Sequence, residues 1–183
     1  MKETAQPKRI MGADCSTQSF AFSIFDEKRL ESYGEIFFDG PTVFHRLADA
    51  QRKIRALSLD LNVDMVYIES AVYVQNKRTV ILLAYAFGAI MAALIDNGAN
   101  DVEEIRPMDW QRAIGNPPLT KAEKQKIDKE NPDRSASWLK NKYRNHRKQR
   151  TIDWVNNKFG ITIESDNVAD AIALGAVQTG AHE

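Results

Sequence analysis

The sequence has little cysteine, no net charge and no long apolar run, and each absence excludes a class of protein. Cys15 is the one cysteine among 183 residues, which excludes a disulfide framework and fits a reducing compartment. We interpret it as a small buried residue at a strand end rather than as a reactive thiol. The longest stretch without a charge, 79–95, has 17 residues and is too short for a confident membrane span, so we expect a buried helix there. Residues 1–9 are polar and do not resemble a signal peptide, so we expect a soluble, cytoplasmic protein without membrane contacts.

The net charge is zero because 25 basic residues balance 25 acidic ones, but the two kinds are unevenly distributed. Residues 134–150 contain no acid, and their basic residues are Arg134, Lys140, Lys142, Arg144, Arg147, Lys148 and Arg150. A charge run of this kind is usually a solvated helix face, but the absence of any acid favours a surface for nucleic-acid phosphates. Trp138 and Tyr143 lie within the run and would stack on unpaired bases. The alternative for Trp138 is an anchor that holds this segment to the core.

Hydrophobic periodicity predicts one domain in which strands and helices follow each other along the chain. Strands are expected at residues 10–14, 19–25, 33–38, 63–68 and 102–105. Helices are expected at residues 43–61, 79–95, 107–114, 147–159 and 166–179. A polar, charge-rich insertion of helical propensity occupies about 116–146 and is interrupted at 131–132. This order predicts an α/β fold, a mixed five-stranded sheet with helices on both faces, in which the first and fourth strands are central neighbours.

Four acidic residues stand where they can converge on one point. Asp14 ends the first strand and Glu69 ends the fourth, and α/β sheets bind ligands at strand ends. Asp166 and Asp170 lie four residues apart at the start of the last helix, so they share a face. Clustered carboxylates repel one another unless a cation lies among them, and hard divalent cations prefer oxygen ligands. The pattern predicts a Mg²⁺-dependent phosphoryl-transfer site. The alternative for each acid is a solvated carboxylate or, for Asp166, a helix N-cap.

Several segments resemble the RuvC-like Holliday junction resolvases of the RNase H superfamily. Residues 12–16, Gly-Ala-Asp-Cys-Ser, are similar to the end of that family's first strand, and residues 67–73, Tyr-Ile-Glu-Ser-Ala-Val-Tyr, to its fourth. Residues 166–171, Asp-Asn-Val-Ala-Asp-Ala, resemble its closing acidic helix, and 147–149, Arg-Lys-Gln, its Lys-Glu-Gln. The resemblance covers about 9–115 and 147–180 and implies an RNase H-like fold. Two features depart from the family pattern: Asn167 stands where many relatives have an acid, and the insertion has no counterpart in the bacterial pattern.

The resemblance also implies a mechanism in which two Mg²⁺ ions, replaceable by Mn²⁺, bracket the scissile phosphate. Cleavage would leave 5′-phosphate and 3′-hydroxyl ends. Asp14 would bind both ions, Glu69 one, and Asp170 with Asp166 the other, with Asn167 as a minor ligand. Lys148 would stabilise the phosphate in the transition state.

The resemblance further implies how the protein would hold a branched DNA. The family places an aromatic wedge in the loop after the fourth strand, where Tyr73 is the candidate. The alternative is a tyrosine packed on the sheet edge. The predicted backbone contacts are Lys77, Arg78, Lys140, Lys142, Arg144, Arg147, Lys148 and Arg150. Resolvases nick two strands symmetrically, which implies a homodimer. Ala84, Gly88 and Ala92 would admit a partner helix or, alternatively, pack on the chain's own sheet.

We therefore expect a structure-selective DNA endonuclease that resolves four-way junctions. One alternative is an RNase H-fold nuclease acting on flaps, forks or RNA–DNA hybrids, and another is a non-catalytic junction-binding protein. An actin-like nucleotide binder is disfavoured because the sequence has no Gly-rich phosphate loop. A compact chain with a divergent insertion is typical of phage enzymes, which would act in the host cytoplasm.

Overall fold

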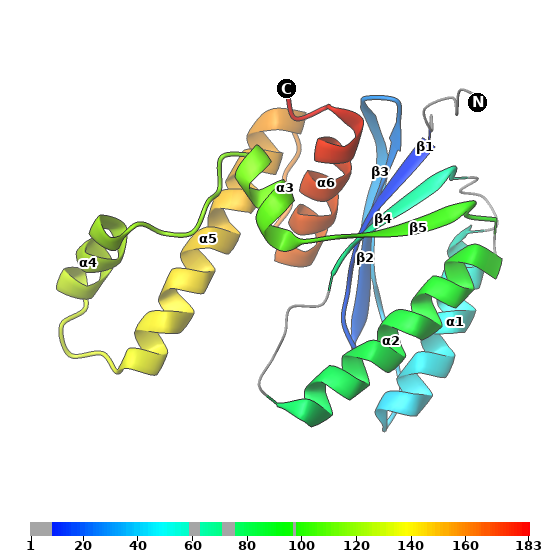
Figure 1. Ribbon diagram of the computed structural model, residues 1–183, viewed down its shortest axis with the longest axis horizontal. Helices are drawn as coiled ribbons and strands as arrows, with labels where there is room; N and C mark the ends of the chain where they lie inside the picture. Colours follow the sequence, from blue (N-terminus) through cyan, green and yellow to red (C-terminus); the bar gives the residue numbers. More distant parts are fainter. Residues whose placement is uncertain (1–8, 59–62, 71–75, 97) are drawn as a thin grey trace, which may run out of the picture.

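The computed structural model describes residues 9–58, 63–70, 76–96 and 98–183. Its strands are β1 (Arg9–Cys15), β2 (Ser19–Asp26), β3 (Arg29–Phe37), β4 (Met65–Glu69) and β5 (Asp101–Ile105). Its helices are α1 (Val43–Ser58), α2 (Lys77–Asp96), α3 (Pro107–Ala113), α4 (Lys121–Glu130), α5 (Ala136–Phe159) and α6 (Asp166–Thr179). The strands form one five-stranded sheet with helices on both faces, which confirms the predicted α/β fold (Figure 1).

The sheet order is β3-β2-β1-β4-β5, so the first and fourth strands are central neighbours as predicted. The hairpins β1–β2 and β2–β3 are antiparallel, whereas β1 and β5 both pair with β4 in parallel. The last register pair between β1 and β4 joins Ala13 to Ile68. Asp14 and Glu69 are the next residues, so both strands present an acid at the same end of the sheet.

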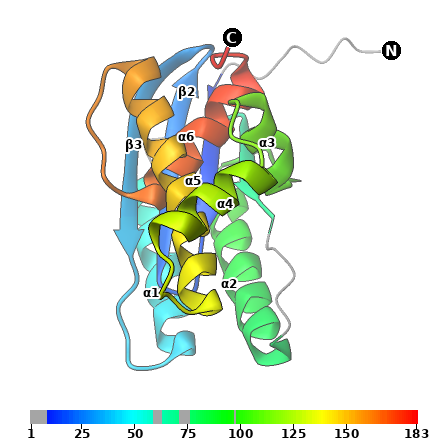
Figure 2. The same cartoon turned by 90° about the vertical axis from the view of Figure 1, so that its left-hand side faces the viewer.

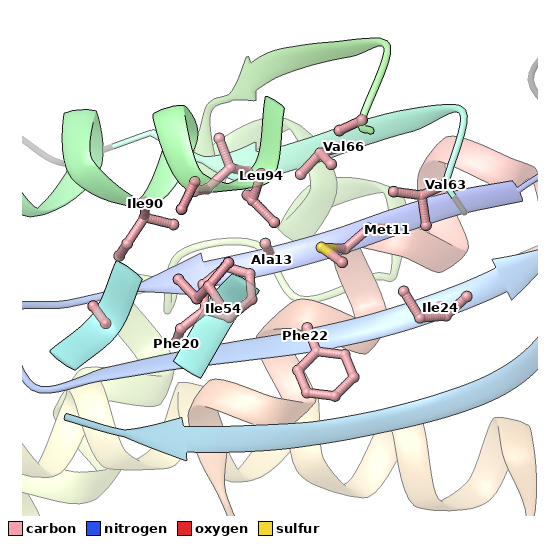
Figure 3. Packing of buried hydrophobic residues seen from close by; sticks show 14 of the residues in the cluster. Met11, Ala13, Phe20, Phe22, Ile24, Ile54, Val63, Val66, Ile90 and Leu94 are labelled. Atoms are coloured by element: carbon pink, nitrogen blue, oxygen red, sulfur yellow. The ribbon is translucent and has the colours of Figure 1, made fainter. Parts of the chain in front are cut away.

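The central strands contribute to two cores because successive side chains point to opposite faces of the sheet. The face covered by α1 and α2 buries Met11, Ala13, Ile54, Ile90 and Leu94 (Figure 3). The opposite face, covered by α3, α5 and α6, buries Ala21, Phe25, Trp110, Val155 and Ile172. Asp14 lies one residue after Ala13 and therefore points to the second face, towards α6.

Helix α6 packs against β1 with no space between the backbones. A Cβ atom on Gly12 would lie 2.3 Å from the Ala171 carbonyl oxygen and 2.6 Å from the Gly175 nitrogen. The Ser23 hydroxyl donates a hydrogen bond of 2.8 Å to the same Ala171 carbonyl. Glycine at position 12 is therefore what allows α6, which carries Asp170, to approach the end of β1.

The helix predicted at 147–159 is wrong at its start, because α5 is one continuous helix from Ala136 to Phe159. Its N-cap is Ser135, and it ends at Gly160 with a left-handed φ of 65°. We call α4 together with the first half of α5, residues 121–147, the arm. Figure 1 shows the arm projecting away from the sheet.

The arm is held together by polar and apolar contacts. Arg150 forms an ion pair with Glu123, and the Tyr143 hydroxyl donates a hydrogen bond to Asp128. Ile127 of α4 is buried. Thr120 and Glu123 form a capping box that fixes the start of α4. The predicted interruption at 131–132 is confirmed, because α4 ends at Glu130.

The helix expected at 79–95 is confirmed by α2, but the expectation that it is buried is wrong. Among the residues of α2, those buried are Ala86, Ile90, Ala93 and Leu94. By length and composition alone, α2 is the one helix in the described part of the chain that could cross a membrane, a test that core helices of soluble proteins also pass. It packs against α1 along one side and leaves an apolar side exposed.

Candidate active site

Three acidic residues lie in one neighbourhood, on β1, β4 and α6. Asp14 and Glu69 lie at the ends of β1 and β4, and Asp170 lies on the second turn of α6. The charge of Glu69 acts on Asp14 and Asp170, and the charge of Asp14 acts on Asp170. The three residues therefore lie close to one another. The structure thus brings together three of the four acids that the sequence singled out.

Burial raises the pKa of all three carboxyl groups, and repulsion adds to it for Asp14 and Asp170. Burial, and then repulsion from Glu69, raises the pKa of Asp14 to about 7. Burial, and then repulsion from Glu69 and Asp14, raises the pKa of Asp170 well above its ordinary value. Burial also raises the pKa of Glu69, although a hydrogen bond from Trp110 opposes the shift. Without a cation among them, these carboxyl groups therefore resist being ionised together.

A divalent cation fits this charge and this donor set, because hard cations take carboxylate oxygens and would relieve the repulsion. As placed, no three acidic, histidine or cysteine side chains of the described residues are close enough to hold one ion between them. Asp14, Glu69 and Asp170 would have to turn towards an ion to bind it. The raised pKa values are the observation that fits a cation site.

Asp166 has a different environment from the other three acids. The N-cap of α6 is Ser165, whose hydroxyl accepts the Val168 N–H, so the alternative of Asp166 as the N-cap is wrong. Asp166 instead forms an ion pair with Lys148 of α5. Burial, and then repulsion from Arg144, lowers the pKa of Lys148, while its ammonium lowers the pKa of Asp14 and Asp170. Lys148 is thus a partial counter-charge for the whole site.

Trp110 is a residue beside the acids that the sequence analysis missed. It is fully buried on α3, and its indole Nε1–H donates a hydrogen bond of 2.9 Å to a Glu69 carboxylate oxygen. Pro107 at the first position of α3 starts this helix directly after β5, which directs Trp110 inward. This hydrogen bond holds the Glu69 carboxylate in one orientation.

Glu35 of β3 is a second residue that the sequence analysis missed. It accepts hydrogen bonds of 2.7 Å from the Ser165 hydroxyl and of 2.7 Å from the Asn167 amide. Burial alone would raise its pKa, but these hydrogen bonds outweigh burial and hold the pKa of Glu35 below its ordinary value. Asn167 is therefore bound to Glu35, and the pair ties the start of α6 to the sheet.

Arg147 is braced by α3 and the segment that follows it. Its guanidinium donates hydrogen bonds to the Gln111 side chain and, at 3.3 Å, to the Asn116 carbonyl. The buried Asn116 amide in turn donates to the Arg147 carbonyl at 2.9 Å and to Thr151 Oγ1 at 3.0 Å. These bonds lock α5 against the body of the protein beside the acids.

A hollow of about 1070 Å³ opens between α3 and α5, and we call it the groove. Glu69 and Asp170 lie in its lining, so it reaches the acids. Its basic lining residues are Arg106, Arg112, Lys124, Lys140, Arg144, Arg147 and Lys148. Its apolar and aromatic lining residues are Pro107, Met108, Pro118, Leu119 and Tyr143.

The predicted DNA contacts fall into separate groups according to whether they line the groove. Its lining includes Lys140, Arg144, Arg147 and Lys148 but not Lys142, and Arg150 is engaged with Glu123. Lys77 and Arg78 are exposed at the start of α2, whose N-terminal end lies at the same end of the molecule as that of α5 (Figures 1 and 2). Tyr73 lies outside the described residues.

No family model and no curated protein matches this sequence. Among solved structures, it is similar to Thermus thermophilus RuvC in complex with a Holliday junction substrate, with a TM-score of 0.66 and 14% identity over 95% of this chain and 93% of that chain. The chain has the RuvC fold. A second structure of Thermus thermophilus RuvC matches with a TM-score of 0.64 and 14% identity over the same shares. A yeast mitochondrial Holliday junction resolvase matches with a TM-score of 0.49 and 9% identity over 96% of this chain and 79% of that chain.

Proposed function

We propose that this protein is a structure-selective DNA endonuclease that resolves four-way junctions by phosphodiester hydrolysis. The observation that carries the proposal is the group of Asp14, Glu69 and Asp170, whose pKa values are all raised, where two strand ends meet helix α6 in a RuvC-like fold. Buried acids with perturbed pKa values in a cleft are typical of catalytic sites. The basic groove that reaches them supports an anionic substrate.

Asp14, Glu69 and Asp170 would hold divalent cations, with Mg²⁺ as the physiological ion and Mn²⁺ as a substitute. Bound there, the ions supply the positive charge that activates the attacking water and stabilises the leaving 3′ oxygen. Trp110 holds the Glu69 carboxylate in one orientation, and Glu35 holds the start of α6, which carries Asp170.

Lys148 would act on the phosphate rather than on the water. Its ammonium lies beside Asp166 and within electrostatic reach of the other acids, so it is positioned where a phosphodiester would arrive. Asp166 orients this ammonium through the ion pair. In this assignment Asp166 is a positioning residue, and a direct metal contact by Asp166 would require that ion pair to break.

A homodimer would supply the two active sites needed for paired cuts. The exposed side of α2 carries the small residues Ala84, Gly88 and Ala92, so this stripe does not pack on the chain's own sheet. Ile81 and Tyr85 are 51% and 50% exposed on the same helix. An exposed apolar face with a small-residue stripe supports close packing against a second copy of α2.

The dimer is tested by Gly88→Leu. A Cβ at Gly88 meets nothing within 4 Å, so the larger side chain fits the monomer but blocks a partner helix. We expect the variant to remain folded and to become monomeric in light scattering at micromolar concentration. A wild-type protein that is already monomeric under these conditions would refute the dimer.

The nuclease function is tested by cleavage of a synthetic four-way junction with and without Mg²⁺, scored for paired symmetric nicks with 5′-phosphate ends. Asp14→Asn should abolish cleavage and leave junction binding intact. Mg²⁺-dependent cleavage by the Asp14→Asn protein would show that the assignment is wrong. Flaps, forks and RNA–DNA hybrids in the same assay distinguish a junction resolvase from other nucleases of this fold.

A further inference from the structure

We propose that the groove between α3 and α5 holds a single unpaired DNA strand that runs from the catalytic acids towards the arm. The inference rests on the proposed nuclease function and adds which form of DNA the site takes. It assigns strand binding to Lys140 and Arg144, two residues of the arm.

The charge of the groove is arranged as a line. Lys140, Arg144 and Lys148 are spaced four residues apart on α5, so they share one face and follow one another at about 6 Å along the helix. The line ends at Lys148, beside the acids. Lys140 and Arg144 are exposed and form no ion pair within the described part of the chain. Their charge is therefore available to successive phosphates of a strand that leaves the active site.

The remaining lining suits bases rather than phosphates. Met108 on α3 is 54% exposed although it is large and apolar, and Tyr143 lies on the arm side of the groove. Arg112 adds a positive charge on the α3 side and makes no ion pair among the described residues. A cationic line combined with apolar and aromatic surface is how proteins bind single strands without reading sequence.

The size of the groove selects the single strand over the duplex. Its volume of about 1070 Å³ is close to that of a large ligand pocket, for which about 300–1,000 Å³ is usual. A space of this size accommodates a few nucleotides of one strand, whereas a duplex would lie across its opening. A strand separated from its partner beside the scissile phosphate does enter it.

The test measures binding of a short oligothymidylate and of a blunt duplex of equal length by fluorescence anisotropy, in EDTA and at several salt concentrations. The double variant Lys140→Ala/Arg144→Ala is compared with Lys126→Ala/Lys129→Ala. The control pair lies on α4, is exposed and does not line the groove, so it removes the same charge from the arm. Each phosphate contact to a single strand contributes about 0.7 to the slope of log K against log salt concentration, so the groove variant should lose about 1.4 of that slope. The control variant should keep the wild-type slope.

Equal losses in the two double variants, or a loss of duplex binding as large as the loss of oligothymidylate binding, would overturn the groove as a strand site. Thermal denaturation confirms that each variant is folded. Binding in EDTA does not depend on cleavage, so this test can refute the groove as a strand site without refuting the nuclease function, and the reverse. A wild-type protein that cleaves no junction, but whose groove variant alone loses oligothymidylate binding, refutes the nuclease and keeps the groove.

Discussion

Replacing Trp110 with phenylalanine would remove the hydrogen bond to Glu69 while keeping an aromatic ring in the core. A hydrogen bond to a charged group contributes about 1.5–3 kcal/mol. Losing a bond to the charged form should therefore raise the pKa of Glu69 further above its already raised value. The smaller side chain also leaves a cavity, and that cost does not depend on pH.

The sign of the pH dependence separates the two effects. Glu69 has a raised pKa in the folded protein, so its ionisation weakens folding as the pH rises above the ordinary value of 4.5. Trp110→Phe enlarges this penalty, and the difference in unfolding free energy between wild type and variant should grow as the pH rises from 5 to 8. Urea denaturation at several pH values measures it.

A matched control is Trp154→Phe, because Trp154 packs edge-on against Phe159 and its indole donates no hydrogen bond to a described residue. Its loss of stability should be the same at every pH. If Trp110→Phe also shows a pH-independent loss, the hydrogen bond does not set the ionisation of Glu69, and the role assigned to Trp110 is wrong.

Three further outcomes are expected. Gly12→Ala should destabilise the protein by about 1–3 kcal/mol, or roughly 2–12 °C in thermal denaturation, because the added methyl meets the backbone of α6; an unchanged melting temperature would contradict the close packing. Cleavage at limiting Mg²⁺ should fall as the pH drops through about 7, because Asp14 takes up a proton there, and saturating Mg²⁺ should move the midpoint to lower pH; a profile flat between pH 6 and 8 would exclude Asp14 as a ligand. Asn116→Ala should cost about 1–3 kcal/mol in urea denaturation, because it leaves partners in α5 without hydrogen bonds; a stability equal to wild type would show that water replaces the amide.

The sheet and three of the acids were predictable from the sequence because they depend on local patterns. Strand periodicity marks the ends of β1 and β4, and the connection rules make these strands neighbours, so Asp14 and Glu69 follow directly. The spacing of four on α6 then predicts the shared face of Asp166 and Asp170. That Asp166 is engaged with Lys148 follows only from how α5 packs beside α6.

The remaining parts of the site depend on contacts between distant segments. The hydrogen bond between Glu35 and Ser165 joins residues 130 positions apart in the sequence, and that between Trp110 and Glu69 joins residues 41 positions apart. Contacts between such distant positions leave no periodic signal in the sequence. The insertion was expected to have helical propensity, but its continuity with the helix at 147–159 was missed for another reason. The arm exposes most of its surface, so residues 136–147 lack the apolar stripe by which a packed helix is recognised in a sequence.

Because α5 is one continuous helix, the arm has a fixed rotation about the helix axis relative to the catalytic residues. Because each residue turns an α-helix by about 100°, deleting or inserting a single residue between Arg144 and Lys148 would swing Lys140 and Arg144 out of the groove while leaving the acids in place. An insertion carried by a loop would tolerate such a change. Here the length of the helix, counted in whole turns, sets the direction in which the arm presents its charge, so we expect changes of about seven residues to be tolerated better than changes of one or two.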